Sequence, residues 1–253
     1  MLLKDKTIII TGATKGIGRT LALASAAEGA NVIISGRDQT AGAALLEQIE
    51  QEGRGHAVFY AGDLCRQETA QQLTDLAVSH FGQLDGLVNY AGTVQASAPL
   101  GSVSAEMLDS IMDINFKSSF YMTQAAVAAM QERGGSIVFM GSLHAKGGEI
   151  DRPAYACSKG AVYTLFSHVA NQYAKRHIRS NWVTIGWVAT PGEEAFRAAV
   201  SDDSHWKEHG SSVMPMGRLQ RPEDYTGAVL YLLSDAAGQT TGSEIVISGG
   251  LRI

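Results

Sequence analysis

The chain has 253 residues, of which 45% are hydrophobic and 18% charged, so it can bury a large core and is not disordered. Its net charge of −5 argues against a nucleic-acid or anionic-membrane partner, because both favour a basic protein face. No apolar stretch could cross a membrane, and Met1 to Lys6 lacks the layout of a signal peptide. The two distant cysteines, Cys65 and Cys157, suggest neither a disulfide scaffold nor a zinc site, so we expect a cytoplasmic protein.

Short β-branched apolar runs alternate along the chain with longer segments of helical period. In chain order, the predicted strands are 7–11, 31–35, 56–60, 86–89, 136–140, 180–185 and 244–247. The predicted helices are 16–28, 39–52, 67–81, 105–133, 155–177 and 222–234. Segment 191–221 shows no single strong period and is predicted to be an irregular insertion that forms a substrate lid.

The strands are continuous apolar runs, which predicts that each is covered on both faces. Strict alternation of strands and helices predicts parallel pairing through right-handed crossovers. We therefore predict an α/β fold with one Rossmann-type, doubly wound parallel sheet of about seven strands and helices on both faces. No linker or repeat marks a boundary, so residues 1–253 are expected to form a single domain.

A glycine-rich loop, Thr11 to Gly18, joins the first strand to the first helix. At this place in a doubly wound sheet, free N–H groups and the positive end of the helix dipole bind the pyrophosphate of a dinucleotide. The spacing is G-x3-G-x-G instead of the commoner G-x-G-x-x-G, and a nucleotide-triphosphate P-loop does not fit. By itself, such a loop is also compatible with an ordinary strand-to-helix turn.

The end of the second strand bears on which dinucleotide binds. A site for NAD usually has Asp or Glu there to hold the adenosine ribose, but this chain has Gly36 followed by Arg37. No carboxylate would repel a 2′-phosphate, and Arg37 with Lys15 could bind one by charge-assisted hydrogen bonds. The sequence therefore favours NADP, with NAD as the alternative, although two solvated cations at a strand end would look the same.

Tyr155 and Lys159 are four residues apart and share one face of a predicted helix. A free tyrosine has a pKa near ~10, but a neighbouring ammonium and the positive ring of an oxidised nicotinamide favour the phenolate and lower that pKa. The phenol could then exchange a proton with a substrate hydroxyl or carbonyl oxygen. Such a pair often arises by chance on a surface, so its meaning depends on the residues around it.

Other polar residues lie where strands end or where a helix is predicted. Ser142 follows the fifth strand, where its hydroxyl could stabilise charge that develops on an oxygen. Asn115 lies inside a predicted helix, where an amide is a modest liability and could equally lie on an exposed face.

Taken together, these residues resemble the short-chain dehydrogenase/reductase family over essentially the whole chain. Thr11 to Gly18 matches the family's TGxxxGxG loop, and Asn89 to Gly92 matches its NNAG motif with tyrosine second. Asp63-Leu64 matches its adenine-side aspartate with an apolar neighbour. Residues 185–190 resemble its Pro-Gly segment, with Ile185 in place of proline. The order and spacing of its catalytic tetrad are matched by Asn115, Ser142, Tyr155 and Lys159.

The resemblance implies hydride transfer between a nicotinamide cofactor and a carbonyl or secondary alcohol. Tyr155 would be the general acid–base, and Ser142 would hold the substrate oxygen. Lys159 would hold the nicotinamide ribose and lower the tyrosine pKa, while Asn115 would anchor a water relay. The implied cofactor-binding residues are Gly12, Thr14, Lys15, Gly16, Ile17, Gly18, Arg37, Asp63, Leu64, Asn89, Ala91, Gly92, Tyr155, Lys159, Gly186, Val188 and Thr190.

In this family, substrate choice depends on the loop after the serine and on the segment after the sixth strand. Both are rich in polar or charged residues here, so we expect a small polar substrate such as a polyol, a sugar or a hydroxy acid. The predicted substrate-binding residues are His144, Glu149, Arg152 and Trp187, although the charged ones could instead be solvated loop residues. No metal is expected, because His205 and His209 lack a third ligand. Family members are often homotetramers, so a homotetramer is implied.

Two other functions remain open. One is 3-oxoacyl-[acyl-carrier-protein] reductase activity, for which Arg133, Arg176 and Arg179 could form a basic docking patch, although the polar substrate loops fit it poorly. The other is a dinucleotide-binding regulatory protein without turnover. A pure binding module does not need a tyrosine beside a lysine, so the intact tetrad disfavours the second alternative.

Overall fold

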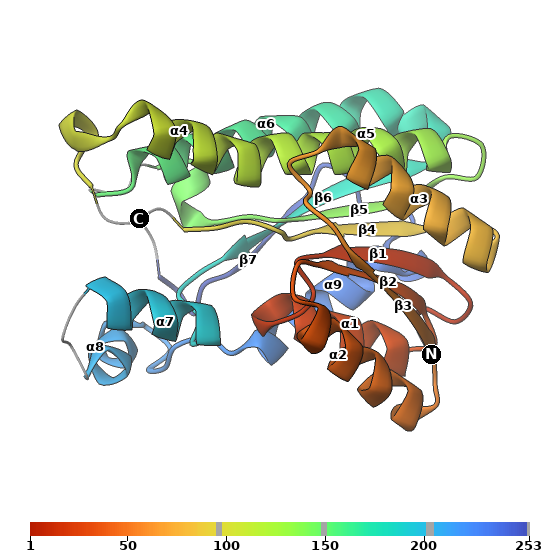
Figure 1. Ribbon diagram of the computed structural model, residues 1–253, viewed down its shortest axis with the longest axis horizontal. Coiled ribbons are helices and arrows are strands. Elements are labelled where there is room, and N and C mark those ends of the chain that lie inside the picture. Colours follow the sequence, from red (N-terminus) through yellow and green to blue (C-terminus); the bar gives the residue numbers. More distant parts are fainter. Residues whose placement is uncertain (95–97, 148–150, 201–204, 252–253) are drawn as a thin grey trace.

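The computed structural model describes residues 1–94, 98–147, 151–200 and 205–251. Within these ranges, the strands form one parallel sheet in the order β3-β2-β1-β4-β5-β6-β7 (Figure 1). The strands are β1 (Thr7–Thr11), β2 (Asn31–Gly36), β3 (His56–Ala61), β4 (Gly86–Asn89), β5 (Gly135–Met140), β6 (Ile178–Ile185) and β7 (Glu244–Ile247). The strand order reverses between β1 and β4, and a doubly wound sheet binds its ligand in the crevice beside such a reversal.

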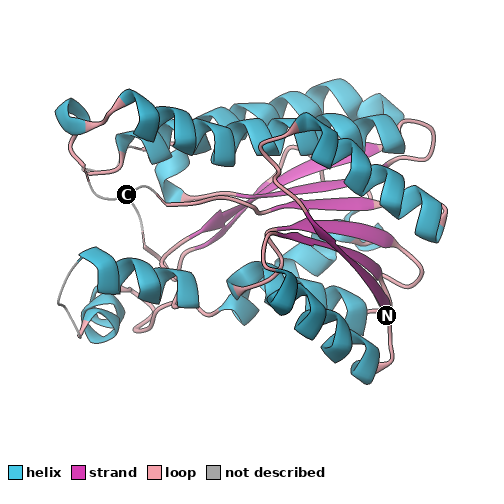
Figure 2. Cartoon of the chain, in the orientation of Figure 1, coloured by secondary structure: helices cyan, strands magenta, loops and turns pink. Residues whose placement is uncertain are grey.

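Helices cover both faces of the sheet (Figure 2). They are α1 (Gly16–Ala27), α2 (Gln39–Glu52), α3 (Gln67–Phe81), α4 (Ala105–Met112), α5 (Ser118–Met130), α6 (Pro153–Tyr173), α7 (Pro191–Val200), α8 (Trp206–Val213) and α9 (Thr226–Leu233). Helices α3 to α6 lie on one face, and α1, α2 and α9 on the other, while α7 and α8 lie beyond the carboxyl ends of the strands (Figure 1). No helix of the described ranges is long and apolar enough to cross a membrane.

The apolar residues of the inner strands contribute side chains to two hydrophobic cores, one on each face of the sheet. In β1, Ile8 and Ile10 pack under α1, α2 and α9, whereas Ile9 packs against the opposite helical layer. Side chains of a strand alternate between the two faces, so a strand buried on both sides is apolar at most of its positions. The expectation that every strand is covered on both faces is wrong at the edges: β3 is only partly buried, and Val246 in β7 is 55% exposed.

Two predicted elements differ from the structure. The helix expected over 105–133 is divided by a π-helical turn, Asp113–Lys117, between α4 and α5. Segment 191–221 is not irregular throughout, because it contains α7 and α8. The sequence shows no single helical period there because each helix is short and has its own apolar face. Smaller differences lie at helix ends, since 3-10 turns replace α-helix at Ala174–Arg176 and Pro222–Tyr225.

Candidate active site

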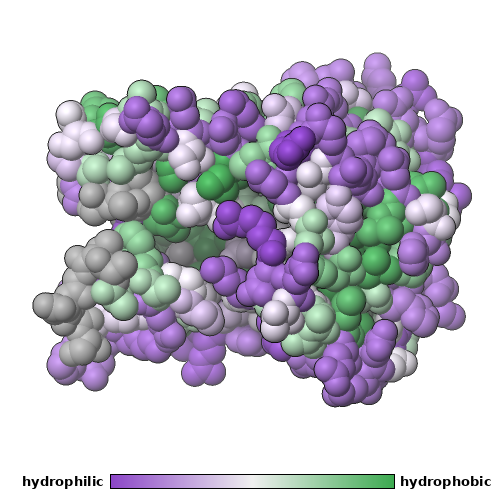
Figure 3. Space-filling view, viewed as in Figure 1, coloured by the Kyte–Doolittle hydropathy of each residue, from purple (hydrophilic) through white to green (hydrophobic). Residues whose placement is uncertain are grey.

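A cleft of about 630 Å³ lies at the carboxyl ends of the strands. The space-filling view shows a hollow with hydrophobic residues inside it (Figure 3). Most of the predicted site residues line the cleft: Lys15, Ile17, Gly92, Ser142, His144, Arg152, Tyr155, Lys159, Gly186, Trp187, Val188 and Thr190. Several others do not: Gly12, Thr14, Gly16, Gly18, Arg37, Asp63, Leu64, Asn89, Ala91 and Asn115. Glu149 is outside the described residues.

The glycine loop is fastened to the end of β4. The Thr11 hydroxyl accepts hydrogen bonds from the backbone N–H of Tyr90 (2.9 Å) and of Ala91 (3.0 Å). Gly12 has φ +67°, and a Cβ there would lie 3.1 Å from the Ala91 Cα, so the two loops meet with no room for a side chain. At the start of α1, Lys15 gives no side-chain capping bond, so the first-turn N–H groups can face a ligand. This geometry fits a pyrophosphate.

The ends of β2 and β3 form a separate, more exposed region. Arg37 and Asp63 are exposed there, whereas Gly36 is buried. Lys15 at the start of α1 is exposed too, and it also lines the cleft. A Cβ at Gly36 would lie 2.5 Å from the Thr14 Cγ2, so the Thr14 side chain fills the space in which an aspartate or glutamate would begin. The missing carboxylate at position 36 is thus enforced by packing.

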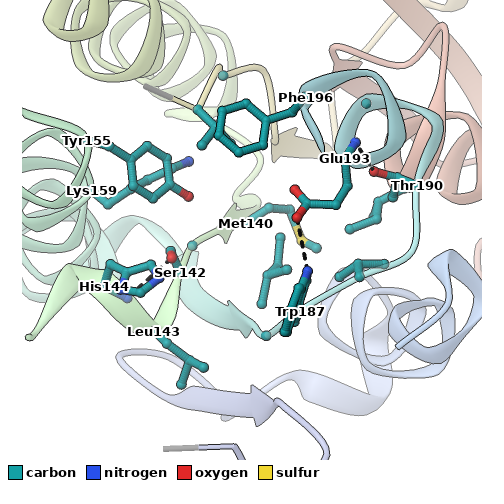
Figure 4. Close-up of a pocket in the computed structure, with 18 of the residues that line it drawn as sticks. Met140, Ser142, Leu143, His144, Tyr155, Lys159, Trp187, Thr190, Glu193 and Phe196 are labelled. Carbon is teal, nitrogen blue, oxygen red and sulfur yellow. Dashed lines mark hydrogen bonds between the residues drawn. The ribbon is translucent and has the colours of Figure 1, made fainter. Parts of the chain in front are cut away.

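Tyr155 and Ser142 reach the cleft from α6 and from the end of β5. Their hydroxyl groups face the same space (Figure 4). Ser142 is 7% exposed, and its hydroxyl oxygen accepts a hydrogen bond from the backbone N–H of His144 (3.2 Å). The His144 ring lies edge-on to the Tyr155 ring, 6.2 Å away between centroids. A substrate oxygen placed between the two hydroxyls would contact both.

Lys159 is 8% exposed, one turn of α6 after Tyr155, and its Nζ lies 5.9 Å from the centre of the Tyr155 ring. Burial lowers the pKa of its ammonium group to about 8. Among the described residues, no acidic side chain forms an ion pair with it. A buried lysine at the base of a cleft fits a hydroxyl-bearing ligand such as the nicotinamide ribose.

Asn115 is fully buried in the π-helical turn, so the alternative of an exposed face is wrong. Its Oδ1 accepts from the Thr93 N–H (2.7 Å), and its Nδ2 donates to the Thr93 carbonyl and to the Ser158 hydroxyl (both 3.0 Å). Ser158 in turn donates to the Tyr155 carbonyl (2.7 Å). π-Helical turns often occur at functional sites. The sequence analysis did not select Ser158, although its position between Tyr155 and Lys159 could have indicated a role beside them.

The segment after β6 forms the opposite wall of the cleft. The Gly186 N–H donates to the Ile247 carbonyl (3.2 Å), so this segment stays aligned with β7 although Ile185 replaces proline. Thr190 caps α7, because its hydroxyl accepts from the Glu193 N–H (3.1 Å).

Helix α7, in the segment that the sequence predicted to be a lid, contributes cleft residues that sequence reasoning did not select. Glu193, Phe196 and Arg197 of α7 line the cleft with apolar Met140, Leu143, Val213 and Leu251. The Arg152 guanidinium lies over the Phe196 ring, 4.7 Å from its centre. The spacing of Glu193 and Arg197 after Pro191 could have indicated an ion pair on a short helix, but not that the pair faces the cleft.

Comparisons with known proteins agree with this geometry. A family model described as "Enoyl-(Acyl carrier protein) reductase" matches residues 12–252. A solved short-chain type dehydrogenase/reductase from Mycobacterium marinum superposes with a TM-score of 0.89 at 32% identity, covering 98% of this chain and 96% of that one. The chain belongs to the short-chain dehydrogenase/reductase family.

Two curated dehydrogenases are similar to this chain over nearly its whole length. A 2,5-dichloro-2,5-cyclohexadiene-1,4-diol dehydrogenase of Sphingobium indicum is 35% identical, covering 98% of this chain and 97% of its own length. An L-rhamnose 1-dehydrogenase (NAD(P)(+)) of Sphingomonas sp. is 32% identical, covering 100% of this chain and 98% of its own. As a short-chain dehydrogenase/reductase, the protein is an oxidoreductase that uses NAD(P), and the alternative of a regulatory protein without turnover is set aside.

Proposed function

We propose that this short-chain dehydrogenase/reductase oxidises a secondary alcohol of a small polyhydroxy compound, a polyol or a sugar, with NADP and Tyr155 as general base. The observation that carries the proposal is the pair of hydroxyls on Tyr155 and Ser142, which face one space beside the buried Lys159. Tyr90 also lines this cleft, but burial raises its pKa to about 12, which keeps it protonated. Tyr155 is therefore the better base.

The mechanism follows from the positions of these groups. Ser142 donates a hydrogen bond to the reacting oxygen, and the Tyr155 phenolate takes the proton of the alcohol. The Lys159 ammonium stabilises the phenolate, and it would hold the ribose hydroxyls of a bound cofactor. Asn115 holds the turn behind Lys159 and anchors a water path along which the proton leaves. The nicotinamide, when bound, supplies the acceptor for the hydride.

The substrate class is supported by the cleft wall and by relatives. His144, Arg152, Trp187 and Glu193 place polar groups among apolar neighbours, which suits a ring with several hydroxyls. Relatives named for a cyclohexadienediol, for L-rhamnose and for L-fucose (31% identical, Oryctolagus cuniculus) act on such rings.

The carrier-protein alternative has less support, although the matching family model is described by such a reaction. The docking patch suggested for it consists of Arg133, Arg176 and Arg179. This patch lies where β5 and β6 begin, whereas the cleft lies at the carboxyl ends of the strands. Arg179 is moreover engaged with the Leu232 carbonyl (2.7 Å). A carrier bound there would lie at the end of the strands opposite to the cleft that contains Tyr155.

For the cofactor, we propose NADP, held at its 2′-phosphate by Arg37 and Lys15. Replacing Arg37 with Gln should raise the Kd of NADP about tenfold and leave that of NAD within twofold, because one charge-assisted hydrogen bond to phosphate is lost. Quenching of tryptophan fluorescence measures both constants without turnover. Arg54→Gln, an exposed arginine before β3 at the far end of the sheet, is the matched control. Equal Kd changes for NAD and NADP would contradict the assignment.

For assembly, we propose a homotetramer in the cytoplasm that pairs through the outer faces of α4 and α5. Phe120 and Leu108 are 41% and 43% exposed on these helices, which suits a covered surface. Ala125 and Ala126, in contrast, are buried within the subunit. Light scattering after size exclusion should give four subunits for the wild type and fewer for Phe120→Glu.

The decisive test of the function is a screen of polyols, sugars, hydroxy acids and simple ketones by absorbance of the reduced cofactor, with NAD and NADP separately. Tyr155→Phe serves as the blank for every compound, because it keeps the cleft and removes only the phenolic oxygen. Turnover of polyols or sugars by the wild type alone supports the proposal. Preferential turnover of apolar ketones, or equal rates in both proteins, would contradict it.

A further inference from the structure

The lid helix α7 places a carboxylate inside the cleft. Glu193 lies in its first turn, with its side chain only 15% exposed. Both oxygens of the carboxylate face the interior of the cleft, across from Tyr155 (Figure 4). The acid thus reaches the space into which a substrate held by Tyr155 and Ser142 must extend.

Two donors hold this carboxylate in place through the same oxygen. The Trp187 indole N–H donates to the Glu193 Oε1 (3.0 Å), and the Arg197 Nε donates to it from one turn further along α7 (2.9 Å). Arg197 also lies over the Trp187 ring, 4.9 Å from its centre, so the three side chains brace one another. Trp187 is itself stacked on Trp206. Since both bonds engage Oε1, Oε2 is presented to the cleft in a fixed orientation.

We propose that Glu193 is a substrate-binding residue that accepts a hydrogen bond from a second hydroxyl of the substrate, so that the enzyme selects diols over monohydric alcohols. The inference rests on the proposed function and deepens it. An ionised carboxylate has only acceptor oxygens, so its natural partner is an uncharged hydroxyl. A substrate carboxylate placed against Oε2 would meet like charge, which Arg197 on Oε1 offsets only in part. The apolar Phe196, Met140 and Leu143 around it suit the carbon ring between the two hydroxyls.

Glu194 provides a matched control on the same helical turn. It is half exposed and pairs with Lys207 of α8, away from the set of residues that lines the cleft. Replacing either glutamate with glutamine removes one charge and keeps the shape of the side chain.

The experiment compares cyclohexane-1,2-diol and cyclohexane-1,4-diol with cyclohexanol and with 2-hydroxycyclohexanecarboxylate, on wild type, Glu193→Gln and Glu194→Gln. For the wild type, we expect kcat/KM to be at least tenfold higher for the better diol than for cyclohexanol. Glu193→Gln should lower kcat/KM for that diol about tenfold, mainly through KM, because a charge-assisted hydrogen bond becomes a neutral one. Cyclohexanol should change less than twofold, the carboxylate should be used better than by wild type, and Glu194→Gln should resemble wild type.

Other results separate the failure of this inference from that of the proposed function. Equal losses for diol and cyclohexanol would mean that Glu193 only supports the lid, and this would overturn the inference while leaving the dehydrogenase function standing. Equal kcat/KM values of the wild type for cyclohexanol and for the better diol would also overturn the inference and leave the dehydrogenase function standing. If the wild type oxidises none of the alcohols, the proposed function and the inference both fail.

Discussion

The floor of the cleft and its lid are built in different ways. The floor consists of Ser142, Tyr155 and Lys159, with Asn115 bonded to Ser158 behind them. These residues belong to elements packed around the central sheet, and Asn115, Ser142 and Lys159 are buried. The lid, α7 and α8, packs through a small separate cluster around Trp206, Met214 and Leu219. Rigid elements hold reacting groups at constant distances, whereas a wall with its own small core can vary without disturbing them. The chemistry is therefore expected to depend on the floor and the choice of substrate on the lid.

The largest effect should come from removing the general base, Tyr155, from the floor of the cleft. Tyr155→Phe should lower kcat by about 10³-fold or more for every substrate, because general acid–base catalysis contributes ~10²–10⁴-fold. The Kd of the cofactor should stay within a fewfold, as measured by fluorescence. A loss confined to some substrates would place Tyr155 among the selectivity residues and contradict the division between floor and lid.

Lys159→Met should lower kcat/KM by about 10²-fold and yet stabilise the folded protein. The lysine pKa is about 8 in the folded protein against an ordinary value of 10.5, so burial of its charge opposes folding at neutral pH. Between these two pH values the unfolded chain binds more protons, and the wild type gains stability as the pH rises. The variant should therefore be more stable at pH 7 by on the order of 2 kcal/mol, and this advantage should shrink as the pH rises from about 8 to 10.5.

Denaturant unfolding of the apoprotein at pH 7 and pH 10 measures that difference. An advantage that is the same at both pH values would show that the methionine acts by packing and not by removing a buried charge. Lys175→Met, an exposed lysine just after α6, is the control and should change neither stability nor activity.

The smallest effect should come from the lid. Trp187→Phe removes the indole N–H that fixes Glu193 and keeps an aromatic ring against Trp206. We expect KM for a diol to rise about two- to fivefold, since a net hydrogen bond is worth ~0.5–1.5 kcal/mol, with kcat within twofold. Steady-state kinetics with cyclohexanol as the second substrate should show no change. A drop in kcat for both alcohols would mean that the lid also positions the floor.

Much of the molecule follows from patterns that are local in the chain. β-Branched and mainly apolar runs such as Thr7–Thr11 identify inner strands, because burial on both faces favours apolar side chains at successive positions. The glycine loop is recognisable in the sequence because it is a single strand-to-helix turn. The Tyr155–Lys159 pair is recognisable because the two residues are one turn apart on one helix. Prediction from the sequence is less reliable for short segments whose structure depends on contacts with residues distant in the chain. The π-helical turn at Asn115, for example, carries an amide that bonds to Thr93 and Ser158, which are distant in the chain.

The sequence by itself determined the order of the elements, the place of the glycine loop and the residue types available for proton transfer, because spacing along the chain encodes them. Only the tertiary structure decided which charged groups meet. It separated Arg133, Arg176 and Arg179 from the cleft, since they lie at or just before the first residues of β5 and β6, whose opposite ends form the cleft. It also brought Glu193 to face Tyr155, because a capped helix and a tryptophan 6 residues earlier fix the direction of that carboxylate. Contacts of this kind depend on the meeting of separate elements in space, which no local periodicity records.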